Sequence, residues 1–167
     1  MATETRVRRP DLYVEDFPAW VEQQVGALRT LAASGVAVPP DLDLPNLIEE
    51  VEDLRKTEQR TVESRVTIAL AHLLKLEFSP TAEPRRGWRT TMIDQRTHLA
   101  QHLTANLRRH VRGRFDELYR RARGSAAEDL QLDGMTLDQL PVESPYTLEQ
   151  VTQQGWWPRN RHGHANP

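Results

Sequence analysis

The sequence predicts an all-α protein: a four-helix-type bundle around one long helix at about residues 46–78, with short C-terminal helices. Between Pro45 and Pro80 there is neither glycine nor proline. Apolar residues recur in this stretch in steps of three, four or eight, which is typical of one face of an α-helix. At about 1.5 Å per residue, such a helix spans roughly 45 Å, a suitable length for the centre of a bundle. The apolar positions are Leu47, Val51, Leu54, Val62, Val66, Ala69, Leu73 and Leu76.

A first helix should precede the long one. Asp16 is a suitable N-cap, and Pro18 in the first turn loses no hydrogen bond by lacking an N–H group. The helix should end at Ser34-Gly35. Residues 36–45 contain three prolines and should form a stiff connector.

Two further helices should follow the proline-bounded loop at 79–84. The third should start near Arg85, and Thr104-Ala105-Asn106 offers a cap that ends it. The fourth should run from Leu107 to Ala122, although Gly113 inside it costs about 1 kcal/mol relative to alanine. The pattern weakens after Gly124.

The last part of the chain should form short elements. We expect a turn at 130–140, a short helix capped by Thr147, and an anchor at Trp156-Trp157. The predicted core residues are Trp20, Leu47, Val51, Leu54, Leu73, Trp88, Leu99 and Phe115.

The organisation along the chain is simple. We expect a flexible arm at 1–10, one helical domain at 11–157 and a disordered tail at 158–167. A length of 167 residues suits a single domain with its own core. No apolar run approaches eighteen residues and residues 1–10 lack that of a signal peptide, so we expect a cytoplasmic protein with no membrane partner.

Charge is segregated although the formal net charge is only −2. Residues 41–63 hold eight acids against three bases, 85–123 hold eleven arginines against three acids, and 124–155 hold six acids without Lys or Arg. We expect these segments to pair with each other, or else one of them to face a partner. There is no cysteine, which excludes disulfides and thiolate chemistry.

An acidic cluster near the start of the long helix is the first candidate site. Glu49, Glu52 and Asp53 share one helix face, where carboxylates could bind a cation or act as acid and base. The alternative is a solvated helix start that favours the helix dipole and pairs with arginines. No Glu-x-x-His motif accompanies the cluster, as di-metal bundles require.

Histidines are the second candidate. If the long helix and the next one form a hairpin, His72 faces Trp88 as a base, a ligand or a structural donor. His98 and His102, four residues apart, could both reach one metal, but the His-Glu-x-x-His pattern is absent. We expect no metal and no cofactor, since nucleotide and hydrolase motifs are also missing.

An arginine-rich run is the third candidate. Such a run could contact phosphates, although no DNA-binding motif accompanies it, and pairing with the acidic segments explains the same charges. The run comprises Arg108, Arg109, Arg112, Arg114, Arg120, Arg121 and Arg123. A basic binding face would consist of Arg108, Arg109, Arg112 and Arg120.

Five motifs occur in order along the chain: Asp16-Phe17-Pro18-Ala19-Trp20, residues 42–52 (LDLPNLIEEVE), residues 70–75 (LAHLLK), residues 88–96 (WRTTMIDQR) and residues 144–151 (SPYTLEQV). Their order and spacing resemble the bacterial family called domain of unknown function 29, over about residues 12–157. The resemblance implies an α-helical bundle without an established activity. Asp94 stands where the family usually has glutamate, and Ser144 where a cysteine often precedes the proline.

Three functions therefore stay open. The first is a non-enzymatic interaction or regulatory protein that binds a protein partner or itself. The second is an arginine-mediated nucleic-acid binder, and the third a metal-dependent enzyme. No residue is assigned as catalytic; the candidate functional cluster is Glu49, Glu52, Asp53, His72, Trp88 and Arg96.

Overall fold

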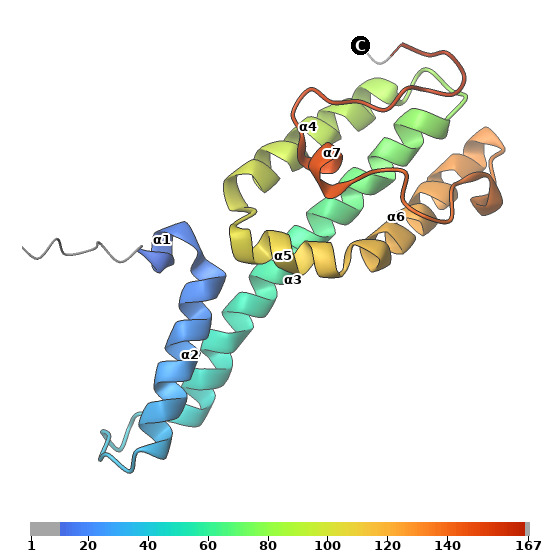
Figure 1. Ribbon diagram of the computed structural model, residues 1–167. Helices are drawn as coiled ribbons and strands as arrows, with labels where there is room; N and C mark the ends of the chain where they lie inside the picture. Colours follow the sequence, from blue (N-terminus) through green and yellow to red (C-terminus); the bar gives the residue numbers. More distant parts are fainter. Residues whose placement is uncertain (1–10, 166–167) are drawn as a thin grey trace, which may run out of the picture. The chain divides into compact units, whose positions relative to one another are not determined.

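The computed structural model describes residues 11–165, all of whose regular elements are helical. The helices are α1 (Leu12–Glu15), α2 (Phe17–Ala33), α3 (Leu44–Phe78), α4 (Arg85–His102), α5 (Ala105–Gly113), α6 (Phe115–Leu130) and α7 (Leu148–Thr152). Two 3₁₀ turns, η1 (Gln131–Asp133) and η2 (Leu137–Gln139), connect α6 to the segment before α7. The predicted all-α architecture around one long helix is confirmed, and α3 is that helix (Figure 1).

Contacts divide the chain into two compact units, and α3 contributes to both. The first unit comprises residues up to Gln59 together with Thr104–Asn106, and the second comprises Arg60–Leu103 and the chain from Leu107 onward. The single domain expected at 11–157 stays a prediction, and the arm expected at 1–10 lies outside the described residues.

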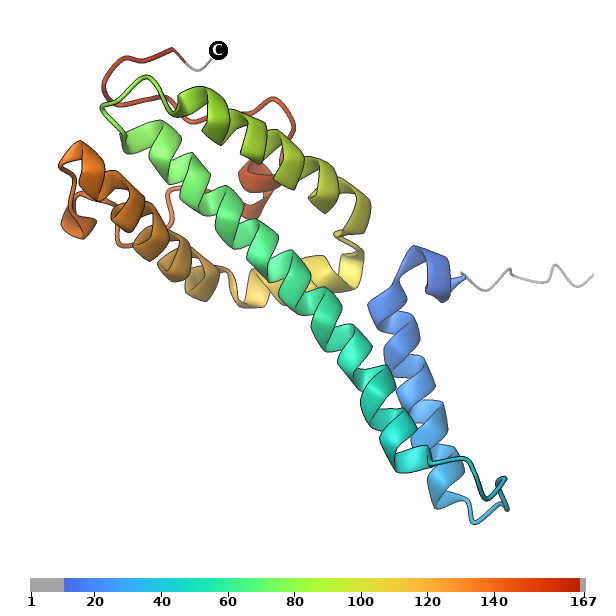
Figure 2. The ribbon, with the colours of Figure 1, turned by 180° about the vertical axis from the view of Figure 1, so that it is seen from behind.

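The first unit is a helical hairpin. Figures 1 and 2 show α2 running alongside the first half of α3, with the connector at one end. Asp16 caps α2 as predicted, because its Oδ1 accepts from the Ala19 N–H at 3.3 Å. Asp43 does the same for α3: its Oδ1 accepts from the Asn46 N–H at 3.2 Å, so the helix starts at Leu44, two residues earlier than expected.

The second unit contains the main core. α4 and α6 lie beside the second half of α3 (Figures 1 and 2). The core residues come from α3, α4, α5, α6 and α7 and from Leu140 and Tyr146. Leu73 and Leu99 are buried as predicted, and Trp88 and Phe115 pack against this core from half-buried positions.

Two core assignments in the first unit are wrong. Leu47 is 38% exposed and Leu54 is 49% exposed, although both continue the apolar periodicity of α3. Trp20 and Val51 are half-buried. In this unit α2 is the one long helix beside α3, so it covers only part of the apolar face that the sequence pattern provides.

The fourth predicted helix is in fact two helices. α5 ends at Gly113, and Arg114 leaves helical geometry with φ −116° and ψ 8° before α6 begins. Glycine is a poor helix former, and Arg114, at the break, makes ion pairs with Glu63 and Glu117. α6 then continues through Gly124 to Leu130, beyond the predicted end at Ala122, and buries Ala126, Ala127 and Leu130.

The C-terminal segment also differs from the expectation of a disordered tail. The Asn160 side chain donates from Nδ2 to the carbonyl oxygens of Leu76, Glu77 and Ser79 at 2.9–3.1 Å. The Arg161 N–H donates to the Glu77 oxygen as well, at 2.9 Å. These bonds satisfy carbonyls at the end of α3 that lack helical partners, which holds this segment in place. Residues 166–167 lie outside the described residues.

No helix among residues 11–165 is both long enough and apolar enough to span a bilayer.

Candidate functional site

The acidic residues of the predicted cluster lie on α3 in the first unit, where two of them form ion pairs. Arg29 Nη2 lies 3.2 Å from Glu52 Oε2, and Lys56 Nζ lies 2.7 Å from Asp53 Oδ1. Glu49 is exposed. Within residues 11–165, no three His, Cys, Asp or Glu side chains are grouped so that they could hold a metal ion. The pairs are solvated, and each contributes about 0–1 kcal/mol.

His72 and Trp88 lie in the second unit and share Lys75 as a neighbour. Lys75 Nζ lies 5.4 Å from the Trp88 ring centroid and 2.7 Å from Asp129 Oδ2. His72 Nδ1 donates to the Ile68 oxygen at 2.9 Å. Burial, followed by the charge of Lys75, lowers the pKa of His72, so its imidazole is neutral at pH 7.

Arg96 connects α4 to the C-terminal end of α7. Its Nε donates to the Val151 oxygen and its Nη2 to the Gln150 oxygen, both at 3.0 Å. The side chain is fully buried, its guanidinium carbon lies 4.8 Å from the Trp157 ring centroid, and burial lowers its pKa to about 10. Arg96 therefore stays charged at pH 7 and binds carbonyls that lack helical partners, which is a structural role.

Most of the arginine-rich run is used inside the second unit. Arg112 Nη2 lies 2.6 Å from Glu149 Oε1, so one base of the run pairs with the acidic C-terminal segment. Arg123 donates from Nη2 to the carbonyl oxygens of Leu137 at 2.9 Å and Leu140 at 3.1 Å. These bonds secure η2 against α6.

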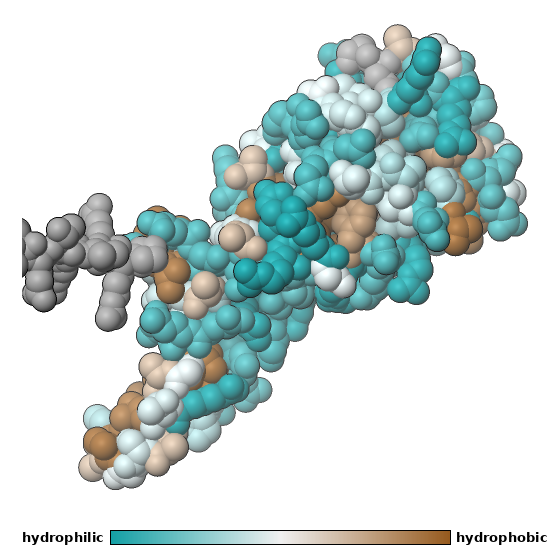
Figure 3. Space-filling view, viewed as in Figure 1, coloured by the Kyte–Doolittle hydropathy of each residue, from teal (hydrophilic) through white to brown (hydrophobic). Residues whose placement is uncertain are grey.

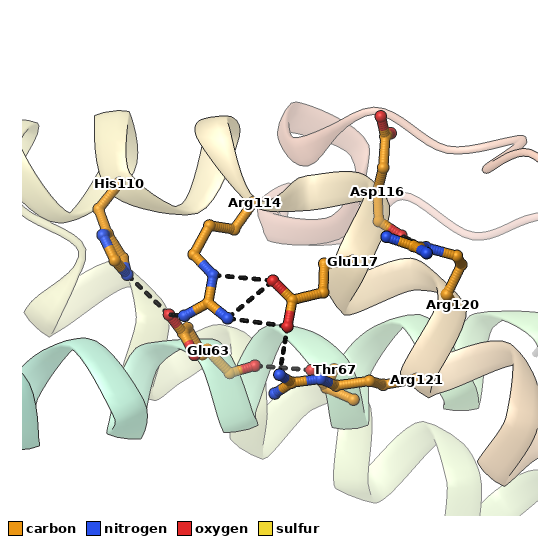
Figure 4. Close-up of polar contacts among 8 residues, drawn as sticks. All are labelled: Glu63, Thr67, His110, Arg114, Asp116, Glu117, Arg120 and Arg121. Atoms are coloured by element: carbon orange, nitrogen blue, oxygen red, sulfur yellow. Dashed lines mark hydrogen bonds and ion pairs between the residues drawn. The ribbon is translucent and has the colours of Figure 1, made fainter.

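Arg114, at the break between α5 and α6, is the centre of a charged network (Figure 4). It pairs with Glu63 of α3 and with Glu117 of α6, and Arg121 pairs with Glu117 from one turn further on. His110 Nε2 lies 2.7 Å from the same Glu63 carboxylate, which is only 7% exposed. The hydrogen bond from Arg114 holds the pKa of Glu117 below its ordinary value.

The predicted basic face is thus partly neutralised. Arg112 forms an ion pair with the carboxylate of Glu149. Arg120 Nε donates weakly to the Asp116 backbone oxygen at 3.4 Å. Arg109 is exposed on α5, and Arg108 is half-buried nearby and acts electrostatically on Glu149. The expectation that basic and acidic segments pair within the chain is confirmed for Arg112 and Arg114.

A cavity of about 560 Å³ lies between α6 and the segment 142–146 in the second unit. Two tyrosines line this cavity, and the hydroxyl group of each already donates a hydrogen bond. Tyr119 donates to the Pro141 oxygen at 2.6 Å, and Tyr146 donates to Glu77 Oε2 at 2.7 Å. Burial raises the pKa of Tyr119 to about 12 and raises that of Tyr146 further, so both hydroxyls stay protonated. The motif Ser144-Pro145-Tyr146 therefore fixes this segment to the core.

The hairpin of the first unit has two different sides. Ion pairs mark one side: Arg55 Nη1 lies 3.2 Å from Glu22 Oε1, and Arg29 pairs with Glu52. In helical projection, the opposite side of α2 carries Trp20 and Leu31, and the corresponding side of α3 carries Leu47 and Leu54. We define the apolar side as Trp20, Leu31, Leu47 and Leu54; the first two are half-buried and the last two exposed.

Aromatic residues extend this apolar side at the start of α2. The Tyr13 ring meets the Trp20 ring edge-on at a centroid distance of 4.9 Å, and Phe17 stacks on Trp20 at 5.6 Å. Tyr13 is 57% exposed. Apolar colour is also visible at the connector end of the hairpin in Figure 3, where Val36 and Leu42 are exposed.

Sequence reasoning missed this surface because it assigned Trp20, Leu47 and Leu54 to the core. One signal was present in the sequence. Acids dominate the polar positions around Leu47 and Leu54, whereas they do not dominate the polar positions further along the same helix. An apolar stripe bordered by one sign of charge is typical of an interface as well as of a core face.

Comparisons with known proteins agree with the observed fold. An α-helical protein of unknown function from Rhodospirillum rubrum has a similar crystal structure, with a TM-score of 0.77 and 25% sequence identity over 86% of this chain and 90% of that one. No curated protein matches the sequence. The family model described as domain of unknown function DUF29 matches residues 12–157. Since that match spans most of the chain, the protein belongs to the DUF29 family.

Proposed function

We propose that this DUF29 protein is a bacterial cytoplasmic interaction protein that binds another protein through the apolar side of its α2–α3 hairpin. The observation that carries the proposal is the exposure of Leu47 and Leu54, 38% and 49%, in the middle of an apolar helix face. Two turns of α3 separate these leucines, so they form a continuous strip with Trp20 and Leu31 of α2.

Energetics favour covering this strip. Burial of apolar surface contributes about 25 cal/mol per Å², so each leucine covered by a partner adds roughly 1 kcal/mol. Two packed helices bury only the faces that contact each other. Any remaining apolar surface is buried only if another helix or sheet packs against it. Contiguous exposed apolar patches larger than roughly a few hundred Å² are rare on monomers and often mark interaction surfaces.

Site-specific photo-cross-linking tests the proposal. A photo-cross-linking amino acid replaces Leu54 in one variant and Ile93 of α4 in another. Ile93 is the matched control, since it is also 49% exposed but lies in the second unit. In bacterial cells we expect protein adducts from position 54 and not from position 93. Equal yields at both positions would contradict the proposal.

Nucleic acid is a second candidate partner, supported by the exposed Arg109 and by Arg108 and Arg120 near it in sequence. Phosphate contacts would make affinity fall steeply as salt rises. The measurement is a titration of fluorescent DNA or RNA at two salt concentrations, with Arg109→Ala as the test variant. Absence of binding at low salt would exclude this candidate.

A further inference from the structure

We infer that the partner segment is a single amphipathic α-helix whose apolar stripe lies along the apolar side of the hairpin and whose borders carry Lys or Arg. This inference rests on the proposed function and specifies the chemistry of its partner. Three features of the first unit support it. They are the shape of the apolar side, the negative charge around it, and the fact that every basic residue described in the unit already forms an ion pair with an acid of the same unit.

The shape fits a helix. Two packed helices leave a shallow groove along each side of their line of contact, and a third helix fits such a groove by placing side chains into it. Buried Val21, Val25 and Leu44 mark the contact between α2 and α3. Leu47 and Leu54 border that contact on the side away from the ion pairs, over roughly 10 Å of α3.

The register of the hairpin extends the groove. The pairs Arg29–Glu52 and Glu22–Arg55 show that α2 and α3 are antiparallel. Leu31, near the end of α2, therefore lies level with the start of α3 near Leu47. Trp20 lies level with a later part of α3. A bound helix of three to four turns would contact the whole strip, with anchors spaced three, four and seven residues apart.

The charge specifies the borders. Residues 11–59 contain eleven acids and three bases, a net charge of −8, whereas the whole chain has −2. On α3, Glu50 projects beside Leu47 and Leu54 on the outer border of the strip. Glu50 is exposed, and none of the residues from 11 to 165 forms an ion pair with it.

The bases of the described part of this unit are already used. Arg29 pairs with Glu52, Arg55 with Glu22, and Lys56 with Asp53. Within residues 11–59, the negative charge of Glu50 beside the apolar side therefore has no basic partner, and such a charge attracts a basic segment and speeds its association. A second copy of this hairpin would bring the same negative charge, and an anionic membrane surface would be repelled in the same way, so both are disfavoured.

Two synthetic peptides test the inference on the full chain. Both have eighteen residues with leucine at identical helical spacing; one has lysine at the polar positions and the other glutamate. Each carries a fluorescent label, and binding is measured by anisotropy at two salt concentrations. We expect the lysine peptide to bind at least tenfold more tightly than the glutamate peptide, and its affinity to fall with salt.

Variants distinguish a specific groove from general attraction to an acidic protein. Leu54→Ser and Glu50→Lys should each weaken binding of the lysine peptide by about fivefold or more. Ile93→Ser is the control, because Ile93 has the same 49% exposure as Leu54, and it should leave binding of the peptide unchanged. Unchanged thermal unfolding confirms that each variant is folded. Equal losses for Leu54→Ser and Ile93→Ser would overturn the inference.

The remaining outcomes are separate from the test of the proposed function. If neither peptide binds, or the glutamate peptide binds as well, the basic helix is wrong, although protein adducts at position 54 would still support an interaction role. If ultracentrifugation shows a dimer that Leu54→Ser dissociates, a second copy occupies the surface and the inference is overturned. If a cysteine introduced by Leu54→Cys is protected from a thiol reagent in the monomer, both proposals fail.

Discussion

The two units of this protein use the same helix in different ways. In the second unit, the residues of α3 from Val62 to Phe78 supply much of a core that α4, α5, α6 and α7 complete. In the first unit, the residues of α3 from Leu44 to Gln59 have one long helix beside them, and Leu44 is the residue of that stretch that is buried. The same apolar periodicity therefore forms a core in one unit and an exposed surface in the other.

The units also differ in how they use charge. In the second unit, carboxylates and arginines join helices and turns, as Glu63, Arg114 and Glu117 do at the break before α6. In the first unit, the ion pairs Arg29–Glu52 and Arg55–Glu22 lie along one side of a hairpin, and among residues 11–165 Glu50 of α3 has no ion pair. The first unit is therefore the part of the protein for which we propose a binding surface.

The largest expected difference concerns leucines of α3 in the two units. Leu73→Ala removes a fully buried side chain from the core and should lower the free energy of unfolding by about 2–5 kcal/mol. Leu54→Ala, at 49% exposure, should change it by less than about 1 kcal/mol. Urea denaturation of both variants measures this contrast; similar losses would show that Leu54 is part of a core.

Arg96→Ala should produce the next largest effect. It removes a buried guanidinium that bonds to the oxygens of Gln150 and Val151, and hydrogen bonds to charged groups contribute about 1.5–3 kcal/mol each. We expect a loss of about 3 kcal/mol, with Arg109→Ala, at an exposed arginine, as the control. Trp157 fluorescence should change as well, since Arg96 lies against its ring. A change no larger than that of Arg109→Ala would contradict the structural role.

Asn160→Ala should release the C-terminal segment from the end of α3. The Ser79 oxygen loses the Nδ2 donor, whereas the Leu76 oxygen keeps Arg85 Nη1 and the Glu77 oxygen keeps the Arg161 N–H, so we expect a loss of about 1–3 kcal/mol from the one carbonyl. The amides of His162 and His164, which donate to Asn160 Oδ1 at 2.9 and 3.2 Å, should then exchange hydrogen faster. The neighbouring Arg159→Ala, at an exposed position, is the control. Unchanged exchange at both amides would show that other contacts hold the segment.

Asp16→Ala tests the first unit. Loss of the N-cap of α2 should cost about 0.5–2 kcal/mol, because the Ala19 amide loses its acceptor. Asp16 also accepts from Thr104 Oγ1 at 3.1 Å and from the Asn106 N–H at 3.2 Å within the same unit. Hydrogen exchange at the start of α2 should rise, while exchange in α6 should stay the same. A uniform rise would indicate that the two units unfold together.

The smallest expected effect is a dependence on pH in the second unit. Arg114 lowers the pKa of Glu117 from its ordinary value of 4.5 in the folded protein. The contribution of Glu117 to stability is therefore fully present above pH 4.5 and is lost as pH falls through the lowered pKa. Glu117→Gln should flatten the stability profile below pH 4.5, measured by thermal unfolding. A profile identical to that of the unchanged protein would contradict this assignment.

Local signals in the sequence were sufficient for most elements. The absence of glycine and proline between Pro45 and Pro80 predicted α3 to within two residues at its start, and Thr147 predicted the cap of α7. Both depend on the preferences of a few neighbouring residues, which act wherever the segment lies.

Of the candidate site, the sequence indicated that this part of α3 is acidic, but the predicted cluster of Glu49, Glu52 and Asp53 does not include Glu50, and the apolar side was assigned to the core. Leu54 and Leu73 belong to one apolar pattern along α3, and the periodicity alone does not distinguish the exposed leucine from the buried one. Periodicity shows which face of a helix is apolar, whereas the number of neighbouring helices determines how much of that face is covered.

The sequence by itself determined the all-α class, the long helix and the family to which the chain belongs. The tertiary structure decided which arginines are paired, where Asn160 bonds and which leucines stay exposed. These features depend on residues far apart in the chain, such as Glu63 with Arg114 and Leu76 with Asn160. Their contacts arise only when several helices pack together, because the free energy of burial depends on every neighbour at once.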